Sequence, residues 1–366
     1  MADPVQIPTK REVLYLGFVI VLLLGLCEGG VRLRSWFKYG TASAGLQSAM
    51  LVRDEASGLL VPRPGYEVRG ANIHIRINSL GFRGQEFSRA KPAGTFRIVC
   101  LGASTTFSAE ASSNDAVWTH RLQEKLRKEF PGRRIEVINA AVSGYVADDN
   151  LRNLRQRVLA LDPDLVIYYE ANNEIVRDTR ELAVREGLIG AEESRQPAWT
   201  SALSNVSLLF DLAYMNMAIL TRSRDTGHRT LDRVPADLPN RFVGVLDQMR
   251  QELSARNISL VLSTFIVKYR RDQDRATQIA NADISFFYMP WMSMDGMLDA
   301  MDVYNGAILD YGKRMGVSVL DDRTAIPADA RHFTDCMHLS DAGNEIMAER
   351  FARFLKLLPE VSGALR

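Results

Sequence analysis

Short apolar runs alternate with helical segments from about residue 96 onward, and this alternation limits the possible folds more than any other feature of the chain. The first apolar run, residues 97–101, ends at Gly102 and precedes helical spacing of apolar residues over 116–129. Further strands are expected at 134–138, 164–169, 259–265 and 317–320, and further helices at 148–161, 241–253, 298–315 and 341–358. Strands that alternate with helices of these lengths predict a largely parallel sheet covered by helices. We therefore predict an α/β fold, a three-layer α/β/α sandwich around a mostly parallel five-stranded sheet.

An apolar stretch without a charge, residues 13–27 (VLYLGFVIVLLLGLC), precedes this domain. At about 1.5 Å per residue a helix of that length spans roughly 22 Å, and extension to about residue 33 brings it close to the ~30 Å hydrocarbon core of a bilayer. No small-x-small cleavage site follows the run, and Leu26 precedes Cys27 where a lipoprotein signal needs a small residue. We therefore expect an uncleaved, single-pass transmembrane anchor over 13–33, after a short tail over 1–12.

The residues that flank the anchor do not define its orientation. Lys10 and Arg11 lie before the apolar run, whereas Arg32, Arg34 and Lys38 lie after it. The positive-inside rule therefore gives no clear answer for this chain.

The rest of the chain divides into a spacer and a main domain. Residues 34–95 contain turn signals and short extended runs, which predict an extended spacer packed on the main domain. The main domain is expected over 96–360, with insertions near 178–237 and 268–297 where the alternation stops. The second insertion is rich in methionine and aromatic residues. Each insertion is interpreted either as extra packing helices or as a lid or partner surface.

Composition argues against several classes of function. The chain has 45 basic and 44 acidic residues, a net charge of +1, so no overall field draws it to nucleic acid. Its three cysteines, Cys27, Cys100 and Cys336, cannot form a disulfide framework and match no zinc motif. The five histidines are scattered and show no metal-binding pairing. We expect no metal site, no cofactor and no nucleic-acid partner.

Polar residues suited to acyl chemistry follow the expected strands, at the edge where open parallel sheets place their sites. Ser104 follows the first strand in LGAST, where a serine can present its hydroxyl to a cleft and its own N–H to an oxyanion. Gly144 follows the second strand in VSGY, so a substrate oxygen could approach its backbone N–H. Asn172 and Asn173 follow the third strand, and a side-chain amide there could donate to an oxyanion. Taken singly, Ser104 and Gly144 are more often turn or helix-capping residues, and helix capping is the simpler interpretation of the asparagines.

An Asp-x-x-His pair, Asp335 and His338, lies just before the last expected helix. In one loop the carboxylate can orient the imidazole, which then takes the serine proton and later returns it to the leaving group. The simpler interpretation is a surface aspartate beside a histidine near a helix start, with Ser340 or Asp341 as the cap.

The order of these four segments resembles the four blocks of the SGNH (GDSL-like) hydrolase family, of the membrane-anchored bacterial type, over residues 96–357. The resemblance implies that Ser104 attacks the acyl carbonyl, that His338 is the base, and that Asp335 orients it. It also implies an oxyanion hole formed by Ser104, Gly144 and Asn173. The DCMH segment is the most specific match, because the LSDAGN that follows it also resembles the start of the family's last helix.

Two segments depart from the family pattern. Ala103 replaces the aspartate of the GDS block, a position at which many members vary. The Gly-x-Asn-Asp block has no literal copy, and its best match is the segment ANNE over 171–174, which makes Asn173 the oxyanion donor. A frame one residue earlier selects Asn172 and places Glu170 at the glycine.

Two rival folds fit the sequence less well. An α/β-hydrolase needs glycine two residues after the nucleophile, where this chain has Thr106, and it places the acid far from the histidine in sequence. A dinucleotide-binding fold needs GxGxxG after its first strand, and this chain has none there.

The expected function is a membrane-anchored serine esterase that cleaves a short-chain O-acyl ester, such as acetyl, through an acyl-serine intermediate. One alternative is an O-acyltransferase that modifies a cell-surface polysaccharide with the same residues. The other is a catalytically silent scaffold that uses the anchor and the Met-aromatic segment. Expected partners are an acyl-ester substrate such as an acylated glycan, the membrane, and a membrane protein. By resemblance to anchored bacterial members, the catalytic domain is expected outside the cytoplasm, on the periplasmic side.

Overall fold

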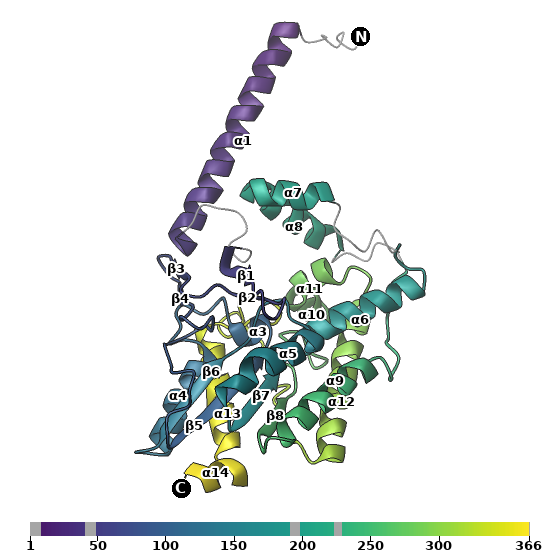
Figure 1. Cartoon of the computed structure of the whole chain (residues 1–366). Coiled ribbons are helices and arrows are strands. Elements are labelled where there is room, and N and C mark those ends of the chain that lie inside the picture. The colour runs from purple at the N-terminus through teal and green to yellow at the C-terminus, as the bar shows by residue number, and fades with distance from the viewer. Residues whose placement is uncertain (1–8, 41–48, 191–197, 223–228, 366) are drawn as a thin grey trace.

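The computed structural model describes residues 9–40, 49–190, 198–222 and 229–365, whose elements are labelled in Figure 1. Its centre is a parallel sheet of five strands in the order β6-β5-β7-β8-β9. The strands are β5 (Thr95–Gly102), β6 (Arg134–Asn139), β7 (Leu165–Tyr169), β8 (Ser259–Ser263) and β9 (Ser318–Leu320). The predicted α/β fold with its parallel five-stranded sheet is confirmed.

Every residue of β5 and β7 is buried, which explains why both strands are apolar over most of their length. β5 pairs with β6 on one side and with β7 on the other, so the chain changes direction across the sheet at β5. Open α/β sheets bind ligands outside the carboxyl ends of the strands at such a switch point. The carboxyl end of β5 is therefore the position where this fold places a site.

Helices cover both faces of the sheet (Figure 1). On one face α4 (Trp118–Glu129) packs against α13 (Asp341–Leu355), and the rings of Trp118 and Phe351 stack with centroids 4.9 Å apart. The other face carries α5 (Ala147–Asn153), α6 (Asn172–Arg185), α9 (Asn240–Ser254) and α12 (Met294–Met315). The last helix, α14 (Pro359–Leu365), follows α13 directly.

Some helix boundaries differ from the sequence prediction. The helix expected over 148–161 is α-helical only in α5; a π-helical turn (Leu154–Val158) and a 3-10 turn (Leu159–Leu161) follow it. The helix expected over 298–315 begins earlier, at Met294, because the Ser293 hydroxyl caps it by accepting the N–H of Gly296. The closing helix expected to reach residue 358 ends at Leu355. Boundaries of this kind depend on local hydrogen bonds that apolar spacing does not encode.

The segment before β5 forms two small antiparallel hairpins, β1 (Leu51–Arg53) with β2 (Leu60–Pro62), and β3 (Glu67–Arg69) with β4 (His74–Arg76). Arg83 joins this segment to the main domain. Its guanidinium is buried and donates to the carbonyl oxygens of Phe107 and Ser108, at the end of the short helix α3 (Ser104–Phe107). The described part of the spacer is therefore in contact with the helix that begins at the expected nucleophile.

The insertions contain helices. The first contributes the end of α6, α7 (Ala198–Val206) and α8 (Leu208–Arg222), and the second contributes α10 (Arg275–Asn281) and α11 (Asp283–Tyr288). Most of the methionine and aromatic side chains of the second insertion are buried, including Phe286, Met289, Trp291 and Met292. These side chains belong to the core of the main domain.

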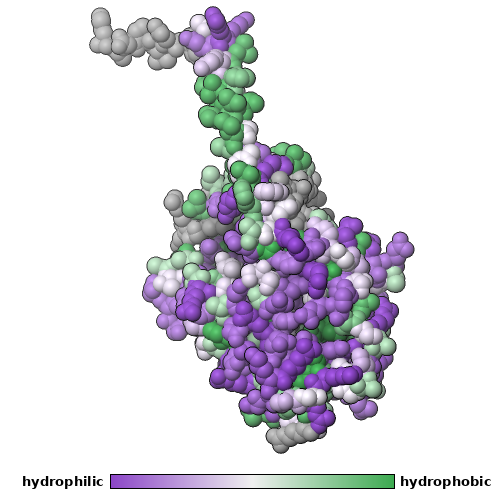
Figure 2. Space-filling view, turned by 90° about the vertical axis from the view of Figure 1, so that its left-hand side faces the viewer, coloured by the Kyte–Doolittle hydropathy of each residue, from purple (hydrophilic) through white to green (hydrophobic). Residues whose placement is uncertain are grey.

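The apolar run near the N-terminus lies inside a single helix, α1 (Lys10–Tyr39), none of whose residues is buried. It begins at a capping box formed by Thr9 and Glu12 and ends at Gly40, which has a φ of 69°. α1 is long and apolar enough to cross a membrane. A signal sequence near an N-terminus has the same length and composition. Figure 2 shows that hydrophobic side chains gather along α1, whereas most of the body below it is hydrophilic on this face.

Candidate active site

Ser104 follows a tight turn after β5 and is half-buried, and the turn depends on the absence of a side chain at Gly102. A Cβ at Gly102 would lie 2.4 Å from the carbonyl oxygen of Tyr169 and 2.4 Å from Oγ1 of Thr106. The Thr106 hydroxyl donates to that same carbonyl oxygen at 3.1 Å. α3 therefore starts immediately beside the end of β7, and Ser104 is its first residue.

Ser104 and His338 come together although 234 positions separate them in the sequence. The Oγ of Ser104 lies 2.8 Å from Nε2 of His338, and Nδ1 of His338 lies 2.6 Å from Oδ2 of Asp335. Oδ1 of Asp335 also accepts the backbone N–H groups of Met337 and His338, each at 2.8 Å. The carboxylate thus holds the ring and the loop at the same time, which fixes the orientation of the imidazole.

The loop that carries Asp335 and His338 is closed on itself and attached to the domain. Thr334 donates its N–H to the carbonyl oxygen of His338 at 2.9 Å, and Phe333 pairs with Leu339 in a short antiparallel bridge. Lys268 donates its N–H to the carbonyl oxygen of Cys336 at 2.8 Å. These bonds position the loop before α13 opposite the turn after β5.

Electrostatics at the pair favour a charged carboxylate. Burial alone would lower the pKa of His338, but the hydrogen bond from its ring to Asp335 and the negative charges of Glu110, Asp335 and, at the alkaline pH where it ionises, Glu170 raise it to about 9. Burial acts against ionisation of Asp335 as well, yet the hydrogen bonds from His338 and Met337 keep its pKa below the ordinary value. Asp335 is therefore ionised at neutral pH and stabilises a positive charge on the imidazole.

Gly144 and Asn173 come from the loop after β6 and the start of α6, and they lie close together. Gly144 has a φ of 85°, a left-handed conformation that favours glycine, and no atom lies within 4 Å of where a Cβ would be. Nδ2 of Asn173 donates to the carbonyl oxygen of Tyr145 at 2.9 Å, so its amide reaches the turn that contains Gly144. Asn172 is buried, and its Oδ1 has no hydrogen-bond partner within the described structure. Of the two asparagines, Asn173 is the one beside Gly144.

Two buried glutamates next to these asparagines are not identified by the sequence analysis as functional residues. Oε1 of Glu170 accepts the backbone N–H of Asn173 at 2.6 Å, and burial raises the pKa of Glu170 to about 8. Glu174 accepts the N–H of Ala147, and its burial raises its pKa to about 7 although the nearby Arg177 opposes this. A glutamate directly after a fully apolar strand, as in YYE, is the sequence signal for such a group.

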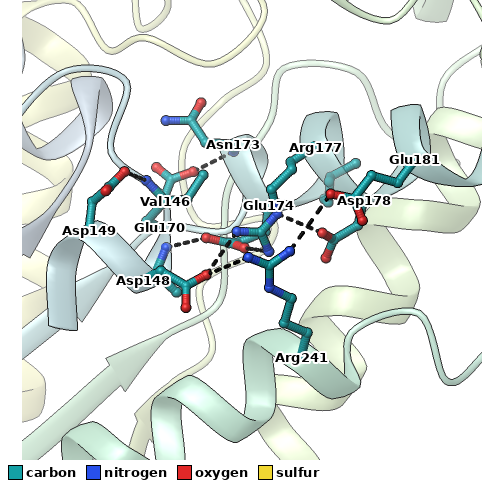
Figure 3. A network of polar contacts seen from close by, with 12 residues as sticks. Val146, Asp148, Asp149, Glu170, Asn173, Glu174, Arg177, Asp178, Glu181 and Arg241 are labelled. Atoms are coloured by element: carbon teal, nitrogen blue, oxygen red, sulfur yellow. Dashed lines mark hydrogen bonds and ion pairs between the residues drawn. The ribbon is translucent and has the colours of Figure 1, made fainter. Parts of the chain in front are cut away.

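Glu174 belongs to a network that ties α6 to α5 and α9 (Figure 3). Arg177 pairs with Glu174, with Asp178 at 2.8 Å and with Asp148 at 3.1 Å, and Arg241 also reaches Asp148 at 3.1 Å. Because Glu174 holds the N–H of Ala147 and Asn173 holds the carbonyl of Tyr145, the network fixes the loop 144–147 against the start of α6.

A cavity of about 650 Å³ beside β8 and β9, lined by residues such as Phe265, Asn305 and Asp322, does not include Ser104, Asp335 or His338. Within the described ranges, no group of three or more His, Cys, Asp or Glu side chains is placed to hold a metal ion.

Comparison with known proteins shows which family the chain resembles. Residues 100–346 match the family model described as the GDSL-like lipase/acylhydrolase family. Similar solved structures include an acetylxylan esterase from Geobacillus stearothermophilus, at 16% identity and a TM-score of 0.44 over 70% of this chain and 93% of that chain. They also include an alpha/beta hydrolase enzyme from the metagenome of Lake Arreo, Spain, at 16% identity and a TM-score of 0.44 over 74% of this chain and 96% of that chain.

No curated protein gives a significant match to the sequence. The family match nevertheless covers about two thirds of the chain, from the end of β5 into α13, and so includes Ser104, Asp335 and His338. The chain therefore belongs to the GDSL-like lipase/acylhydrolase (SGNH) family and is an ester-hydrolysing enzyme.

Proposed function

We propose that this enzyme is a membrane-anchored serine esterase that removes a short O-acyl group, such as acetyl, through an acyl-serine intermediate. The observation that carries the proposal is the continuous hydrogen-bonded line from Ser104 through His338 to Asp335, with distances of 2.8 and 2.6 Å. A nucleophile, a base and an orienting carboxylate in this arrangement constitute the machinery for acyl transfer to serine.

In the first half of the reaction, His338 takes the proton of Ser104 as its Oγ attacks the acyl carbonyl carbon. The carbonyl oxygen becomes an oxyanion that receives the backbone N–H groups of Ser104 and Gly144 and the amide of Asn173. His338 then gives its proton to the departing alcohol. In the second half, His338 takes a proton from a water molecule as the water oxygen attacks the acyl carbonyl carbon. The bond to Ser104 Oγ then breaks, His338 returns the proton to that oxygen, and the acid leaves.

The proposed location follows from α1 and from the family resemblance. α1 has no buried residue, and its 15 uncharged residues from Val13 to Cys27 favour insertion in a bilayer. We propose that it remains as an anchor and that the catalytic domain lies outside the cytoplasm, where an acylated glycan is a suitable substrate.

Replacement of the nucleophile tests the proposal. We expect Ser104→Ala in the full chain, in detergent micelles, to lower turnover of p-nitrophenyl acetate by roughly 10³-fold or more. Ser112→Ala is the matched control, because Ser112 is exposed and its hydroxyl donates to Asp341, which is not part of the proposed triad. A fluorophosphonate should label the wild type and the control but not Ser104→Ala. Equal turnover by Ser104→Ala and wild type would refute the mechanism.

A substrate panel then defines the acyl group and its acceptor. We expect acetyl esters to be cleaved faster than octanoyl esters. Addition of a sugar acceptor distinguishes hydrolysis from transfer, because transfer to a glycan hydroxyl uses the same residues and yields an acylated sugar in place of free acid.

A further inference from the structure

Two helices outside the sandwich carry exposed apolar side chains within the part of the chain that the structure describes. On α7 the side chains of Trp199, Leu203 and Val206 recur at helical spacing, and on α8 those of Met217 and Leu220 do. Each of these side chains is between 44% and 68% exposed. α7 contains no charged residue. Such a surface, made of large side chains on two adjacent helices, marks a contact with another apolar phase.

A polar clamp attaches the junction between α7 and α8 to α1. The Glu28 carboxylate accepts the Ser207 hydroxyl at 2.8 Å and the N–H of Leu209 at 2.9 Å, and so caps the start of α8. Arg32 pairs with Glu28 at 2.6 Å and donates to the carbonyl oxygen of Val206 at 2.5 Å, at the end of α7. One ion pair on α1 therefore holds both helices.

The position of this clamp on α1 sets the level of the two helices relative to a bilayer. Glu28 is the first charged residue after the uncharged run 13–27, so it marks the end of the apolar part of α1. An acidic group paired with arginine is stable at the boundary of the hydrocarbon layer and costly inside it. α7 and α8 start from this boundary and run crosswise to α1, with α7 farther from the sheet (Figure 1).

Phe210 and Tyr214 of α8 contact other parts of the protein. The rings of Phe210 and Tyr214 stack with centroids 5.9 Å apart, and Tyr214 meets Phe287 of α11 edge to face at 6.2 Å. Trp199 of α7 contacts Phe210 at 6.2 Å. α8 is therefore fixed between α11 and α7, while Met217 and Leu220 on its last turns remain exposed.

We infer that the α7–α8 hairpin rests in the interfacial layer of the bilayer that α1 enters, with Trp199, Leu203, Val206, Met217 and Leu220 in contact with lipid. A bilayer surface is favoured over a protein partner because the faces adjoin α1, lie at the level where its apolar run ends, and include an amphipathic tryptophan. This inference rests on the proposed anchoring of α1 and is independent of the proposed catalysis.

The hairpin also determines which end of the sheet meets the membrane. The carboxyl ends of β5 and β7, with Ser104 in α3, face the side of the molecule on which α1, α7 and α8 lie (Figure 1). With two attachments, one spanning and one interfacial, the domain cannot rotate freely about α1. The hairpin holds the candidate active site toward the bilayer surface.

Nitroxide labelling of the full chain in phosphatidylcholine nanodiscs tests the inference. Cys27 is exposed while Cys100 and Cys336 are buried, so the wild type carries its own reporter on α1. In a Cys27→Ala background, Val206→Cys and Met217→Cys report on the hairpin. Leu357→Cys is the control, because Leu357 is 75% exposed at the opposite end of the molecule. Collision of each label with oxygen, which concentrates in lipid, is compared with collision with a water-soluble nickel chelate.

We expect labels at 27, 206 and 217 to collide with oxygen in preference to nickel, and the label at 357 to show the reverse preference. Nickel access at both 206 and 217 with lipid contact at 27 would overturn the inference and leave the anchor intact. Low collision with both reagents at 206 and 217 would also overturn it, because a protein partner would then cover the faces. Nickel access at 27 would remove the anchor and the inference together. None of these outcomes depends on turnover, so failure here is distinct from failure of the esterase proposal.

Discussion

Burial raises the pKa of two carboxyl groups near His338, but hydrogen bonds outweigh it at only one of them. Asp335 is partly buried but accepts the imidazole and two backbone N–H groups, so its pKa stays below the ordinary value. Glu170 is almost fully buried, and its burial raises its pKa to about 8 even though it accepts the N–H of Asn173. Near pH 7 Asp335 therefore carries the charge that balances an imidazolium, while Glu170 is mainly protonated.

The raised pKa of His338 predicts an alkaline activity profile. A general base must be neutral to accept a proton, and the pKa of His338 is raised to about 9, so kcat/KM should increase with pH and level off above that value. Asp335→Asn removes the main interaction that raises this pKa, so the inflection should move to lower pH. The rate should also fall by roughly 10⁴-fold, since the ring loses its orienting carboxylate. A pH profile of kcat/KM for both proteins is the measurement, and an unchanged inflection would contradict the assignment of Asp335.

The protonated state of Glu170 predicts a difference between two substitutions. In Glu170→Gln an amide oxygen can still accept the N–H of Asn173, so we expect a folded enzyme with near wild-type turnover at pH 7. In Glu170→Ala that buried N–H loses its partner, at a cost of about 1–3 kcal/mol in the free energy of unfolding, and kcat should fall because Asn173 is less well held. Thermal unfolding and kcat are measured for both.

The pH dependence of the free energy of unfolding shows whether Glu170 is protonated in the folded protein. The pKa of Glu170 is raised above its ordinary value of 4.5, so between that value and about 8 the folded protein holds a proton that the unfolded chain has lost. The wild type should therefore become less stable as pH rises through this window. Glu170→Gln should lose that part of the slope. A slope identical to that of the wild type would show that Glu170 is ionised in the folded protein.

At the scale of secondary-structure elements, the network around Arg177 links α5, α6 and α9 and fixes their relative positions (Figure 3). Arg177 bonds to the fully buried Glu174 and to Asp178, and it shares Asp148 with Arg241. Because Glu174 in turn holds Ala147 at the start of α5, the network determines where the Gly144 loop lies relative to α6. Gly144 and Asn173, the expected oxyanion residues, lie just before α5 and at the start of α6. The ion pairs between these helices set the spacing of the two residues.

Removal of Arg177 and removal of Arg241 should lower the free energy of unfolding by very different amounts. Arg177→Ala leaves a buried carboxylate without its partner, so we expect a loss of roughly 3–5 kcal/mol in the free energy of unfolding. Arg241→Ala removes a half-exposed partner of the same Asp148 and should cost under about 1 kcal/mol. Denaturant unfolding of the full chain in detergent compares the two. Equal costs would show that Arg177 is no more important to stability than a surface ion pair.

At the scale of the whole molecule, one apolar helix stands apart from a body of nearly balanced charge. The net charge is +1, so a general attraction to anionic lipid contributes little to membrane association. α1, the proposed anchor, has no buried residue. Membrane association should therefore depend on hydrophobic insertion.

Extraction experiments test this dependence. We expect the full chain to stay with membranes in 1 M salt and in alkaline carbonate, because neither condition weakens hydrophobic insertion to the extent that it weakens surface electrostatic attraction. A double variant, Val21→Arg with Leu24→Arg, should be released to a large extent, since each charge at the helix centre costs roughly 2.5–3.5 kcal/mol. Release of the wild type by salt alone would contradict a spanning helix.

Local sequence pattern was sufficient to predict much of the fold. The fully buried strands β5 and β7 are apolar runs in the sequence, and the alternation of such runs with helical segments predicted the fold class. The family was predicted from four polar segments, three after strands and one before the last helix. Apolar spacing could not predict that the helix after β6 changes to a π-helical turn at Leu154, or that α12 begins at Met294. Those details depend on individual hydrogen bonds at helix ends.

The sequence alone determined which segments are strands, helices and membrane-spanning candidates, because periodicity and composition act over neighbouring residues. Only the tertiary structure decided the strand order, the 2.8 Å approach of Ser104 to His338, and which asparagine lies beside Gly144. It also decided that Glu170 is buried and that Glu28 holds the α7–α8 junction. Burial, pKa and contact depend on residues far apart in the chain, and their values are set only when the whole chain has packed.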